Sequence, residues 1–359
     1  MMKNNRAIPF NKENFKQIFS KEFALVIIIS IPSAMVAEYF NVPLAWFLGP
    51  MLITSLASLM GLKTIMPRLV LSSILIILGL YIGNYIDKTL FSQIHQWAWT
   101  SMIMLVYIII SVLLVSKYLQ RFANYERKTS IFSAAPGALG PLMILAEDEK
   151  SDLSQVATSH LIRLIIIITI FPFIVDNFYS VDNVEAVEEV LKDQNIYHFI
   201  ILIIASIFFV LIFEKLKIPA ALLAGTLVAS GILQISEIAY YKLSPNIIDY
   251  CLLILGSSVG CRFADKTFSE ISKNALHSFV ATFLLVILGL FAAFIAGLII
   301  DKNFFTLLLS YCPGGIYEVA VIAIFFDLDP EFVSFHHIIR LLMILFIVPI
   351  LLKILQKKP

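Results

Sequence analysis

The feature that most constrains this chain is a series of long apolar segments. Each is close to the ~20 residues that an α-helix needs to cross ~30 Å of hydrocarbon. Their approximate bounds are 23–40, 44–61, 67–86, 97–116, 130–147, 156–175, 197–213, 219–236, 247–261, 276–300, 305–326 and 333–352. Only 14% of the residues are charged, against roughly 25% in soluble proteins. Soluble enzymes, disordered regulators and nucleic-acid binders are therefore poor interpretations, and a lipid bilayer is the expected partner.

Cysteine and histidine placement gives no sign of a metal centre. The three cysteines, Cys251, Cys261 and Cys312, lie in or beside apolar segments without a paired metal-binding spacing. The six histidines are scattered, and the adjacent His336 and His337 would diverge by about 100° on a helix. No Walker loop or common hydrolase motif occurs. We therefore expect no cofactor, no metal and no enzymatic activity.

The two halves of the chain match each other residue by residue. From residue 135 onward the second half follows the first at a constant offset of 177 residues. The equivalent pairs are Pro136 and Pro313, Gly137 and Gly314, Asp152 and Asp329, His160 and His337, Arg163 and Arg340, and Pro172 and Pro349. Rare and polar residues rarely keep one register by chance. The sequence therefore predicts an internal duplication, which many transporters contain.

Polar stretches divide the chain into five parts. We predict a cytoplasmic N-terminal segment 1–22, a first membrane repeat 23–175, an acidic linker 176–196, a second membrane repeat 197–352 and a cytoplasmic tail 353–359. The N-terminal segment is basic, and no clear small-residue cleavage site follows it. The first apolar segment is therefore expected to be a retained span rather than a signal peptide.

The distribution of lysine and arginine bears on the topology. If segments 130–147 and 305–326 span the membrane, each half has six spans and the repeats are parallel. If both segments are re-entrant, each half has five spans and the repeats are inverted. The inverted arrangement leaves few loop cations outside, namely Lys88, Lys192, Lys242 and Lys302, as the positive-inside rule favours. We predict an all-α polytopic membrane protein of the bacterial inner membrane, with its N-terminus inside and two inverted repeats of five transmembrane helices, each with a broken re-entrant Pro-Gly segment.

Each predicted re-entrant segment contains a helix-breaking motif. Pro136 and Gly137 interrupt the first segment, and Pro313, Gly314 and Gly315 interrupt the second. Proline removes a backbone donor, and glycine costs a helix about 1 kcal/mol. Broken helices at corresponding positions of two repeats are the best sequence indication of a transporter's midplane site. An ordinary kinked helix is the alternative.

Arg163 and Arg340 lie deep in apolar segments. The twelve residues that follow each arginine span ~18 Å of a ~30 Å core, so each charge is expected inside the hydrocarbon region. It should face the protein interior and have a partner there. The arginine could bind an anionic solute, tie down carbonyls of the break or snorkel to the interface. His160 and His337, one turn before each arginine, could hold it or carry a proton.

Glu318 distinguishes the two broken segments. It follows Gly314 by four residues, and Pro141 occupies the equivalent position of the first half. An ionisable residue within a membrane segment is a functional candidate by default. We expect Glu318 to carry the coupling proton or to bind Na⁺, with an ion pair to Arg163 or Arg340 as the alternative.

The duplicated module resembles the AbrB-type integral membrane proteins, the "AbrB duplication" family. The likeness rests on the Pro-Gly-Gly turn at Pro313, the His337-x-x-Arg340 motif and the apolar, proline-containing tail. It extends over about residues 23–352. The resemblance implies an architecture similar to inverted-repeat cation/anion transporters. The family also carries labels that connect it with gene regulation and with an ammonia monooxygenase. Ala138 stands where the family pattern has a second glycine, which implies two breaks that are not fully symmetric.

Secondary transport of a small anionic solute, coupled to H⁺ or Na⁺ by alternating access, is the leading hypothesis. The expected solute-binding residues are Pro136, Gly137, Pro313, Gly314, Gly315, Arg163, Arg340, His160 and His337, with Glu318 as the coupling acid. A nucleic-acid partner is not expected, and the architecture is compatible with a homodimer. The alternatives are a membrane-embedded regulator or sensor that affects gene expression indirectly and, less favoured, a metal-dependent monooxygenase.

Overall fold

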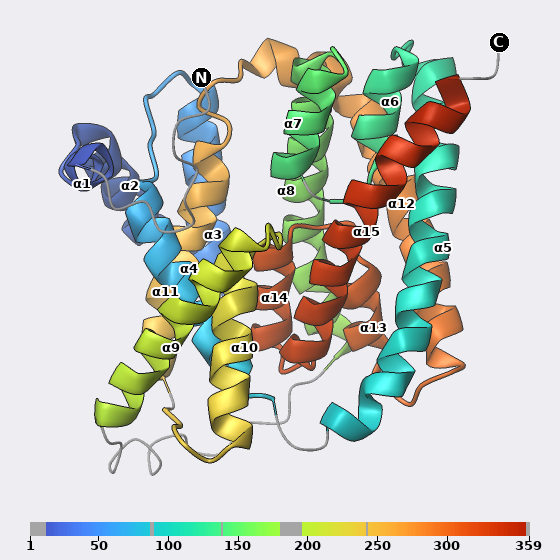
Figure 1. Cartoon of the computed structure of the whole chain (residues 1–359). Coiled ribbons are helices and arrows are strands. Elements are labelled where there is room, and N and C mark those ends of the chain that lie inside the picture. Colours follow the sequence, from blue (N-terminus) through green and yellow to red (C-terminus); the bar gives the residue numbers. More distant parts are fainter. Residues whose placement is uncertain (1–11, 87–89, 138, 180–195, 242, 357–359) are drawn as a thin grey trace. The chain divides into compact units, whose positions relative to one another are not determined.

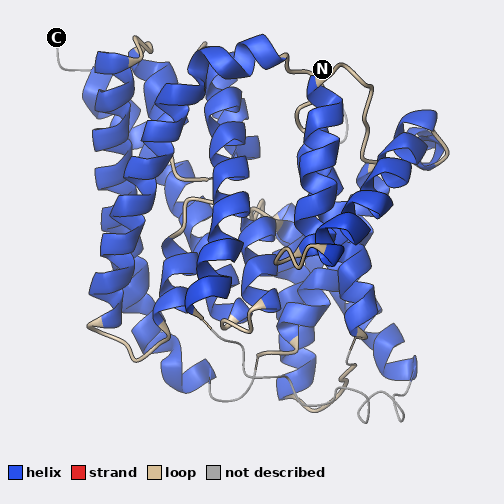
Figure 2. Cartoon of the chain, turned by 180° about the vertical axis from the view of Figure 1, so that it is seen from behind, coloured by secondary structure: helices blue, strands red, loops and turns tan. Residues whose placement is uncertain are grey.

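The computed structural model describes residues 12–86, 90–137, 139–179, 196–241 and 243–356. Helices are the regular elements of these ranges, and no strand occurs within them (Figure 2). In chain order the helices are α1 (Lys12–Ile18), α2 (Lys21–Tyr39), α3 (Ala45–Leu59), α4 (Arg68–Gly83), α5 (Leu90–Phe122), α6 (Arg127–Ala134), α7 (Leu139–Asp148), α8 (Leu153–Phe178), α9 (Ile196–Lys215), α10 (Ala221–Ile235), α11 (Pro245–Cys261), α12 (Phe268–Gly297), α13 (Phe304–Tyr311), α14 (Ile316–Phe325) and α15 (Pro330–Gln356) (Figure 1).

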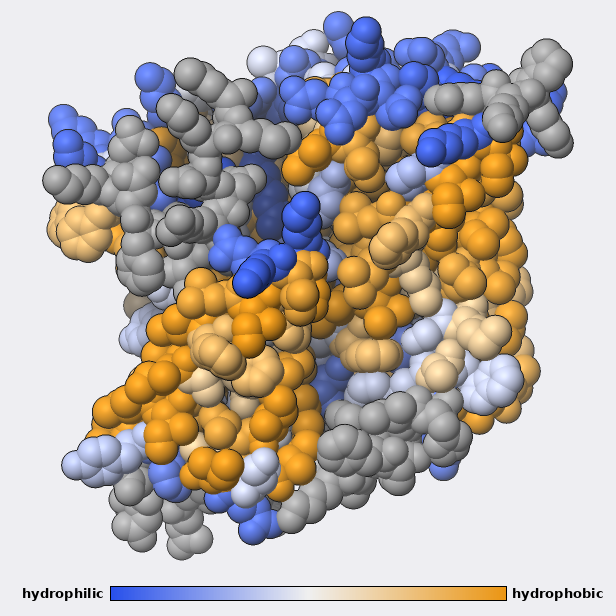
Figure 3. Space-filling view, in the orientation of Figure 1, coloured by the Kyte–Doolittle hydropathy of each residue, from blue (hydrophilic) through white to orange (hydrophobic). Residues whose placement is uncertain are grey.

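The length and composition of the helices confirm an all-α polytopic membrane protein. Six stretches of the described chain are long and apolar enough to cross a membrane, and α3, α4, α10, α11 and α14 are shorter apolar helices. Apolar side chains cover the outer surfaces of α5, α9 and α15 (Figure 3), where Ile204, Phe208, Phe346 and Ile350 are exposed. Exposure of large apolar side chains on this scale indicates a lipid environment.

The chain forms two compact units, and each unit draws on both repeats. Unit 1 contains α1 to α4 and α9 to α11, and unit 2 contains nearly all of α5 to α8 and α12 to α15. Every apolar segment predicted from the sequence corresponds to one helix or, in the fifth segment of each half, to a pair of short helices. The predicted linker 176–196 lies mostly outside the described residues.

Glycine pairs on α4 and α11 organise unit 1. Both helices carry a Gly-x-x-x-Gly motif, which allows close approach of a second helix. Each motif packs on a helix of the other repeat, and a Cβ at any of the four glycines would overlap its neighbour. The contacts are Gly79 with Thr226, Gly83 with Ser230, Gly256 with Phe47 and Gly260 with Thr54. The sequence match pairs Gly83 with Gly260 and Thr54 with Ser230. The Gly83–Ser230 and Gly260–Thr54 contacts are therefore equivalent, so the residues that match in sequence also make matching contacts.

Equivalent helices of the two repeats run in opposite directions within unit 2. The Tyr118 hydroxyl of α5 lies 3.2 Å from Nδ1 of His277 on α12, and the Tyr107 hydroxyl donates to the Leu285 carbonyl at 3.3 Å. Residue numbers thus fall along α5 as they rise along α12, so these helices are antiparallel.

The same relation holds for α8 and α15. The Arg127 guanidinium donates to the Leu355 carbonyl near the end of α15, at 2.7 Å. The Thr129 hydroxyl accepts from the Asp152 backbone N–H just before α8, at 3.1 Å. The beginning of α8 and the end of α15 therefore lie at one end of unit 2, beside the beginning of α6.

Each broken segment forms a hairpin that returns to the end from which it starts. Lys128 near the start of α6 pairs with Glu149, just after α7, at 2.9 Å. Lys302, before α13, lies 5.4 Å from the centre of the Phe332 ring near the start of α15. The two hairpins therefore begin at opposite ends of unit 2 (Figure 1).

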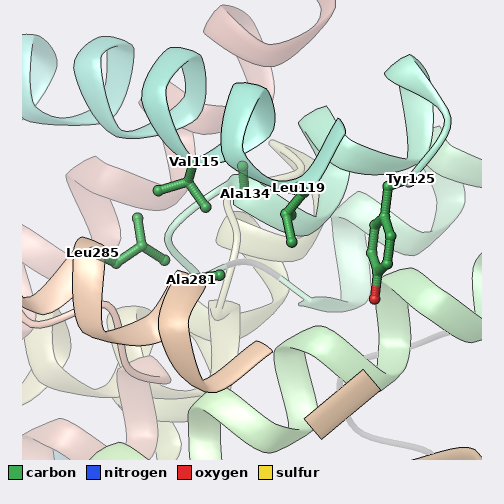
Figure 4. Close-up of a cluster of buried hydrophobic side chains, with 6 residues drawn as sticks. All are labelled: Val115, Leu119, Tyr125, Ala134, Ala281 and Leu285. Atoms are coloured by element: carbon green, nitrogen blue, oxygen red, sulfur yellow. The ribbon is translucent and has the colours of Figure 1, made fainter. Parts of the chain in front are cut away.

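A buried apolar cluster holds the first hairpin in unit 2. Ala134, the last residue of α6, packs with Val115 and Leu119 of α5 and with Ala281 and Leu285 of α12 (Figure 4). Tyr125 also belongs to this cluster, and its hydroxyl lies 3.3 Å from the Ser159 hydroxyl on α8. The cluster fixes the point at which the first break begins.

Candidate functional site

The first break separates α6 from α7 at Pro136 and Gly137. Gly137 has φ +106°, a conformation that glycine adopts easily and other residues do not. Because α6 ends here, its last carbonyls lack helical partners. Arg163 of α8 satisfies two of them, donating to the Ala135 carbonyl at 2.6 Å and to the Ser133 carbonyl at 2.5 Å.

The second break is held in an equivalent way from α15. Arg340 donates to the carbonyls of Cys312 and Gly314, the latter at 2.7 Å. It also donates to Nδ1 of His337 at 2.9 Å, since arginine has no acceptor. The other ring nitrogen of His337 therefore carries the proton and donates to the Leu309 carbonyl at 3.0 Å. His337 is thus a neutral side chain that positions Arg340.

His160 has the equivalent partner in the first repeat. Its Nε2 donates to the Phe132 carbonyl at 3.0 Å, twenty-eight residues earlier in the chain. The His337–Leu309 bond spans the same interval. In both repeats the histidine and the arginine of the His-x-x-Arg motif therefore donate hydrogen bonds to buried carbonyls at and just after the end of the helix that precedes the break.

Both arginines are buried, with Arg163 2% and Arg340 1% exposed. This burial contradicts snorkelling. Within the described residues their hydrogen bonds go to carbonyls and to His337, and none goes to a carboxylate. The Nε atom of each guanidinium has no hydrogen-bond partner within the same ranges. Each arginine therefore stabilises a break through hydrogen bonds to its carbonyls, and its Nε–H remains able to donate to a further acceptor.

Arg340 also touches the break of the other repeat. A Cβ built on Gly137 would lie 3.1 Å from Nη2 and 3.4 Å from Nε of Arg340. Gly314, the equivalent of Gly137, has Val319 and Ile167 as its neighbours instead of Arg163. The guanidinium of Arg340 therefore contacts both breaks, whereas among the described residues the hydrogen bonds of Arg163 go to the first break.

Glu318 lies in the first turn of α14 and is 1% exposed. Its carboxylate folds back over Gly315, so a Cβ at Gly315 would overlap Oε2. In the first turn of α7 the equivalent residue is Pro141, and the neighbouring Gly140 is exposed with open space around its Cβ position. The two breaks therefore differ in charge and in access.

A polar network beside the second break was not predicted from the sequence. His336 is fully buried, and its Nε2 lies 2.8 Å from the Thr100 hydroxyl of α5. The Tyr311 hydroxyl donates to the Thr100 carbonyl at 2.7 Å. In the other repeat Ser159, the equivalent of His336, makes a hydroxyl contact of 3.4 Å with Ser278 of α12. In the sequence, a polar residue precedes the histidine of each repeated motif, Ser159 before His160 and His336 before His337, and this pattern could have indicated the network.

Asp152 is a helix cap rather than part of the site. Its carboxylate accepts from the backbone N–H of Gln155 at 3.0 Å, at the start of α8, as its position before an apolar run indicates. Among the described residues, no group of three or more His, Cys, Asp or Glu side chains could hold a metal ion.

Two curated bacterial proteins are similar to most of this chain. "Uncharacterized protein YhjN" of Bacillus subtilis (strain 168) is 22% identical over 290 residues, which cover 76% of this chain and 75% of the relative. "Putative regulator AbrB" of Escherichia coli (strain K12) is 24% identical over 312 residues, covering 85% and 88%. No solved structure gives a significant match.

A family match extends over the breaks, both arginines and Glu318. The family described as "Transition state regulatory protein AbrB" matches residues 46–356. This range takes in most of both repeats, and the two relatives agree with it. The chain therefore belongs to the AbrB family, and its helices make it a multi-pass membrane member of that family.

Proposed function

We propose that this protein is a secondary transporter of a small anionic solute, with its binding site at the two breaks of unit 2. The observation that carries the proposal is the position of Arg340, which holds the second break by two carbonyls and lies against Gly137 of the first. Irregular backbone at membrane depth is tolerated where it is buried in protein or lines a cavity. A buried cation with a spare donor favours an anionic ligand there.

We further propose that the repeats are inverted, that both hairpins are re-entrant and that the N-terminus is cytoplasmic. The antiparallel course of α5 and α12 supports the inversion. Within unit 2, the end where α5 finishes carries Arg121, Arg127 and Lys128, whereas Lys302 lies at the other end. Positive charge of this kind favours the cytoplasmic side.

Cysteine labelling is expected to place the two ends of α12 on opposite sides of the membrane. Both Ser272 and Asp301 are exposed. In a background without native cysteines, Asp301→Cys should react with an impermeant thiol reagent from outside, and Ser272→Cys only after the membrane is opened. The reverse pattern would contradict the proposed orientation, and labelling of both from one side would contradict a spanning α12.

Glu318 is proposed as the coupling acid. It is buried at the end of a broken helix, and the first repeat has no acid at the equivalent position. Buried carboxylates in transport proteins commonly exchange a proton or hold a cation. A single coupling acid is consistent with one coupling ion per transport cycle, H⁺ or Na⁺.

A membrane-embedded regulator is the second candidate, because one relative is named a regulator and the family description is regulatory. Counterflow in proteoliposomes separates the two. Vesicles loaded with unlabelled succinate, glutamate, phosphate or sulfate are diluted into a trace of the same labelled anion. A transporter accumulates label transiently for at least one of these anions. Label no higher than in empty vesicles for all of them, with changed transcription in a deletion strain, would favour the regulator.

A further inference from the structure

We propose that a groove between α5 and α12 binds an anionic diacyl phospholipid, whose phosphate lies at Lys117 and Arg121 and one of whose acyl chains lies between the two helices. We call this surface the α5–α12 groove. Its apolar lining includes Val106, Tyr107 and Ile110 of α5 and Phe291, Ala292 and Ile295 of α12. All of these residues belong to unit 2. The inference goes beyond the proposed transport, and its tests need no flux.

The apolar part of the groove is open on its outer side. Val106 and Ile110 on one helix and Phe291 and Ile295 on the other are exposed, whereas Ala292 between the latter two is buried. A hollow of about 110 Å³ lies among these side chains. An empty hollow would leave its lining without dispersion contacts on one side. In a lipid environment an acyl chain is the molecule that supplies them.

The same face of α5 continues into a cationic end. Val106, Ile110, Leu114, Lys117 and Arg121 follow one another at intervals of three or four residues, so they share one side of the helix. Leu114, Lys117, Tyr118, Arg121 and Phe122 line a second, open hollow of about 390 Å³. Both cations are exposed, and among the residues that the structure describes neither side chain forms an ion pair or a hydrogen bond. Two cations are therefore available to a phosphate at this end of the groove.

The start of α12 adds further charge beside this end. Tyr118 contacts His277 on α12 at 3.2 Å, and Lys273, one turn before His277, is exposed. Glu270, three residues earlier again, is the acid of this face of α12. Together with the two cations of α5, the face carries three cations against one acid, an excess of two positive charges. Such an excess beside membrane helices favours an anionic head group over a neutral one.

The spacing along α5 matches the depth of one leaflet. Lys117 follows Ile110 by seven residues and Val106 by eleven, which correspond to ~10 Å and ~16 Å along a helix. One leaflet contributes ~15 Å of hydrocarbon, half of the ~30 Å core. A phospholipid with its phosphate at Lys117 therefore extends an acyl chain into the apolar part of the groove. In the proposed orientation this lipid belongs to the cytoplasmic leaflet.

The charges also argue against a second copy of this chain in the groove. A twofold dimer uses the same patch on both subunits, and two copies inserted in one orientation meet at equal depth. Lys117 and Arg121 of one copy would then face the same cations of the other. Ile110→Cys is therefore expected to remain monomeric when the membrane is treated with an oxidant. A disulfide-linked dimer at this position would contradict lipid as the occupant.

Thermal unfolding of the purified full chain in detergent tests the head-group site. Dioleoyl phosphatidylglycerol is expected to raise the melting temperature by roughly 2–5 °C through mass action, and dioleoyl phosphatidylcholine by much less. The double variant Lys117→Gln, Arg121→Gln should lose this difference. The control Lys150→Gln, Lys353→Gln removes two exposed cations elsewhere in unit 2 and should keep it. Equal shifts with the two lipids, or the full shift with glycerol 3-phosphate alone, would overturn the proposal.

Tryptophan quenching locates the acyl chain independently of stability. The chain has three tryptophans, which are replaced by phenylalanine before Phe291→Trp is introduced in the groove. In phosphatidylcholine vesicles, a small fraction of phosphatidylglycerol with brominated chains should quench this tryptophan about twofold or more than the same fraction of brominated phosphatidylcholine. Phe346→Trp, on the exposed surface of α15, should be quenched equally by both lipids. Equal quenching of Phe291→Trp by the two lipids would contradict a bound anionic lipid.

Discussion

Alanine in place of Arg340 is expected to abolish anion binding and to destabilise the protein. The change removes the donors of the Cys312 and Gly314 carbonyls and the guanidinium that lies against Gly137 of the first break. Buried carbonyls left without partners cost roughly 2–4 kcal/mol together, a fall in melting temperature of about 5 °C or more. Loss of a charge-assisted hydrogen bond should weaken binding of the transported anion by about tenfold or more.

Arg163→Ala is the matched control for this prediction. Arg163 also holds two carbonyls of a break and is equally buried, so its removal should lower the melting temperature by a similar amount. Arg163 makes no contact with Gly314 equivalent to that of Arg340 with Gly137, so anion binding should survive. Thermal unfolding and binding of the anion that gives counterflow, measured on both variants, check the difference. Equal loss of binding in the two variants, or unchanged binding in Arg340→Ala, would contradict the assigned role of Arg340.

Glutamine in place of Glu318 is expected to uncouple transport. The amide has nearly the shape of the protonated acid, but it neither releases a proton nor binds a cation as a carboxylate does. Uptake driven by an imposed pH or Na⁺ gradient should therefore fall by about tenfold or more, which is the size of effect expected when an essential acid–base group is lost. Exchange of solute between the two sides should persist, because the neutral residue resembles the protonated state.

Glu147→Gln controls for the loss of a carboxylate as such, since Glu147 is exposed at the far end of α7. This variant should keep gradient-driven uptake. If Na⁺ is the coupling ion, Glu318→Gln should also lose any stabilisation of the folded protein by Na⁺. A Glu318→Gln protein that is less stable but retains full gradient-driven uptake would show a structural role and rule out coupling.

The sequence was sufficient to predict an all-α polytopic membrane protein, because the signals for apolar helices are local. Proline and glycine interrupt a helix wherever tertiary contacts place it, and Pro136 and Pro313 both lie between two short helices, as their residue types predict. The depth of Arg163 and Arg340 in apolar runs predicted burial, and both are buried. The duplication was visible because polar residues kept one register through a highly apolar chain.

Local sequence patterns could not predict the contacts between segments that are distant in the sequence. The bonds from Arg340 to Cys312 and Gly314 join residues more than twenty-five positions apart, and no periodicity specifies such a partner. The contact of Arg340 with Gly137 depends on how two hairpins pack in three dimensions. The divergence of His336 from His337 argued against a metal centre, and the same divergence directs His336 to Thr100 of α5.

This member of the AbrB family is proposed to couple the movement of an anion to an ion gradient. The most direct test is uptake of labelled succinate, glutamate, phosphate and sulfate into proteoliposomes under an imposed pH gradient and, separately, an imposed Na⁺ gradient. At least one anion is expected to reach an internal concentration above the external one, and an ionophore that dissipates the gradient should abolish this accumulation. Folded protein that never accumulates any of these anions beyond the level of empty vesicles would contradict coupled anion transport.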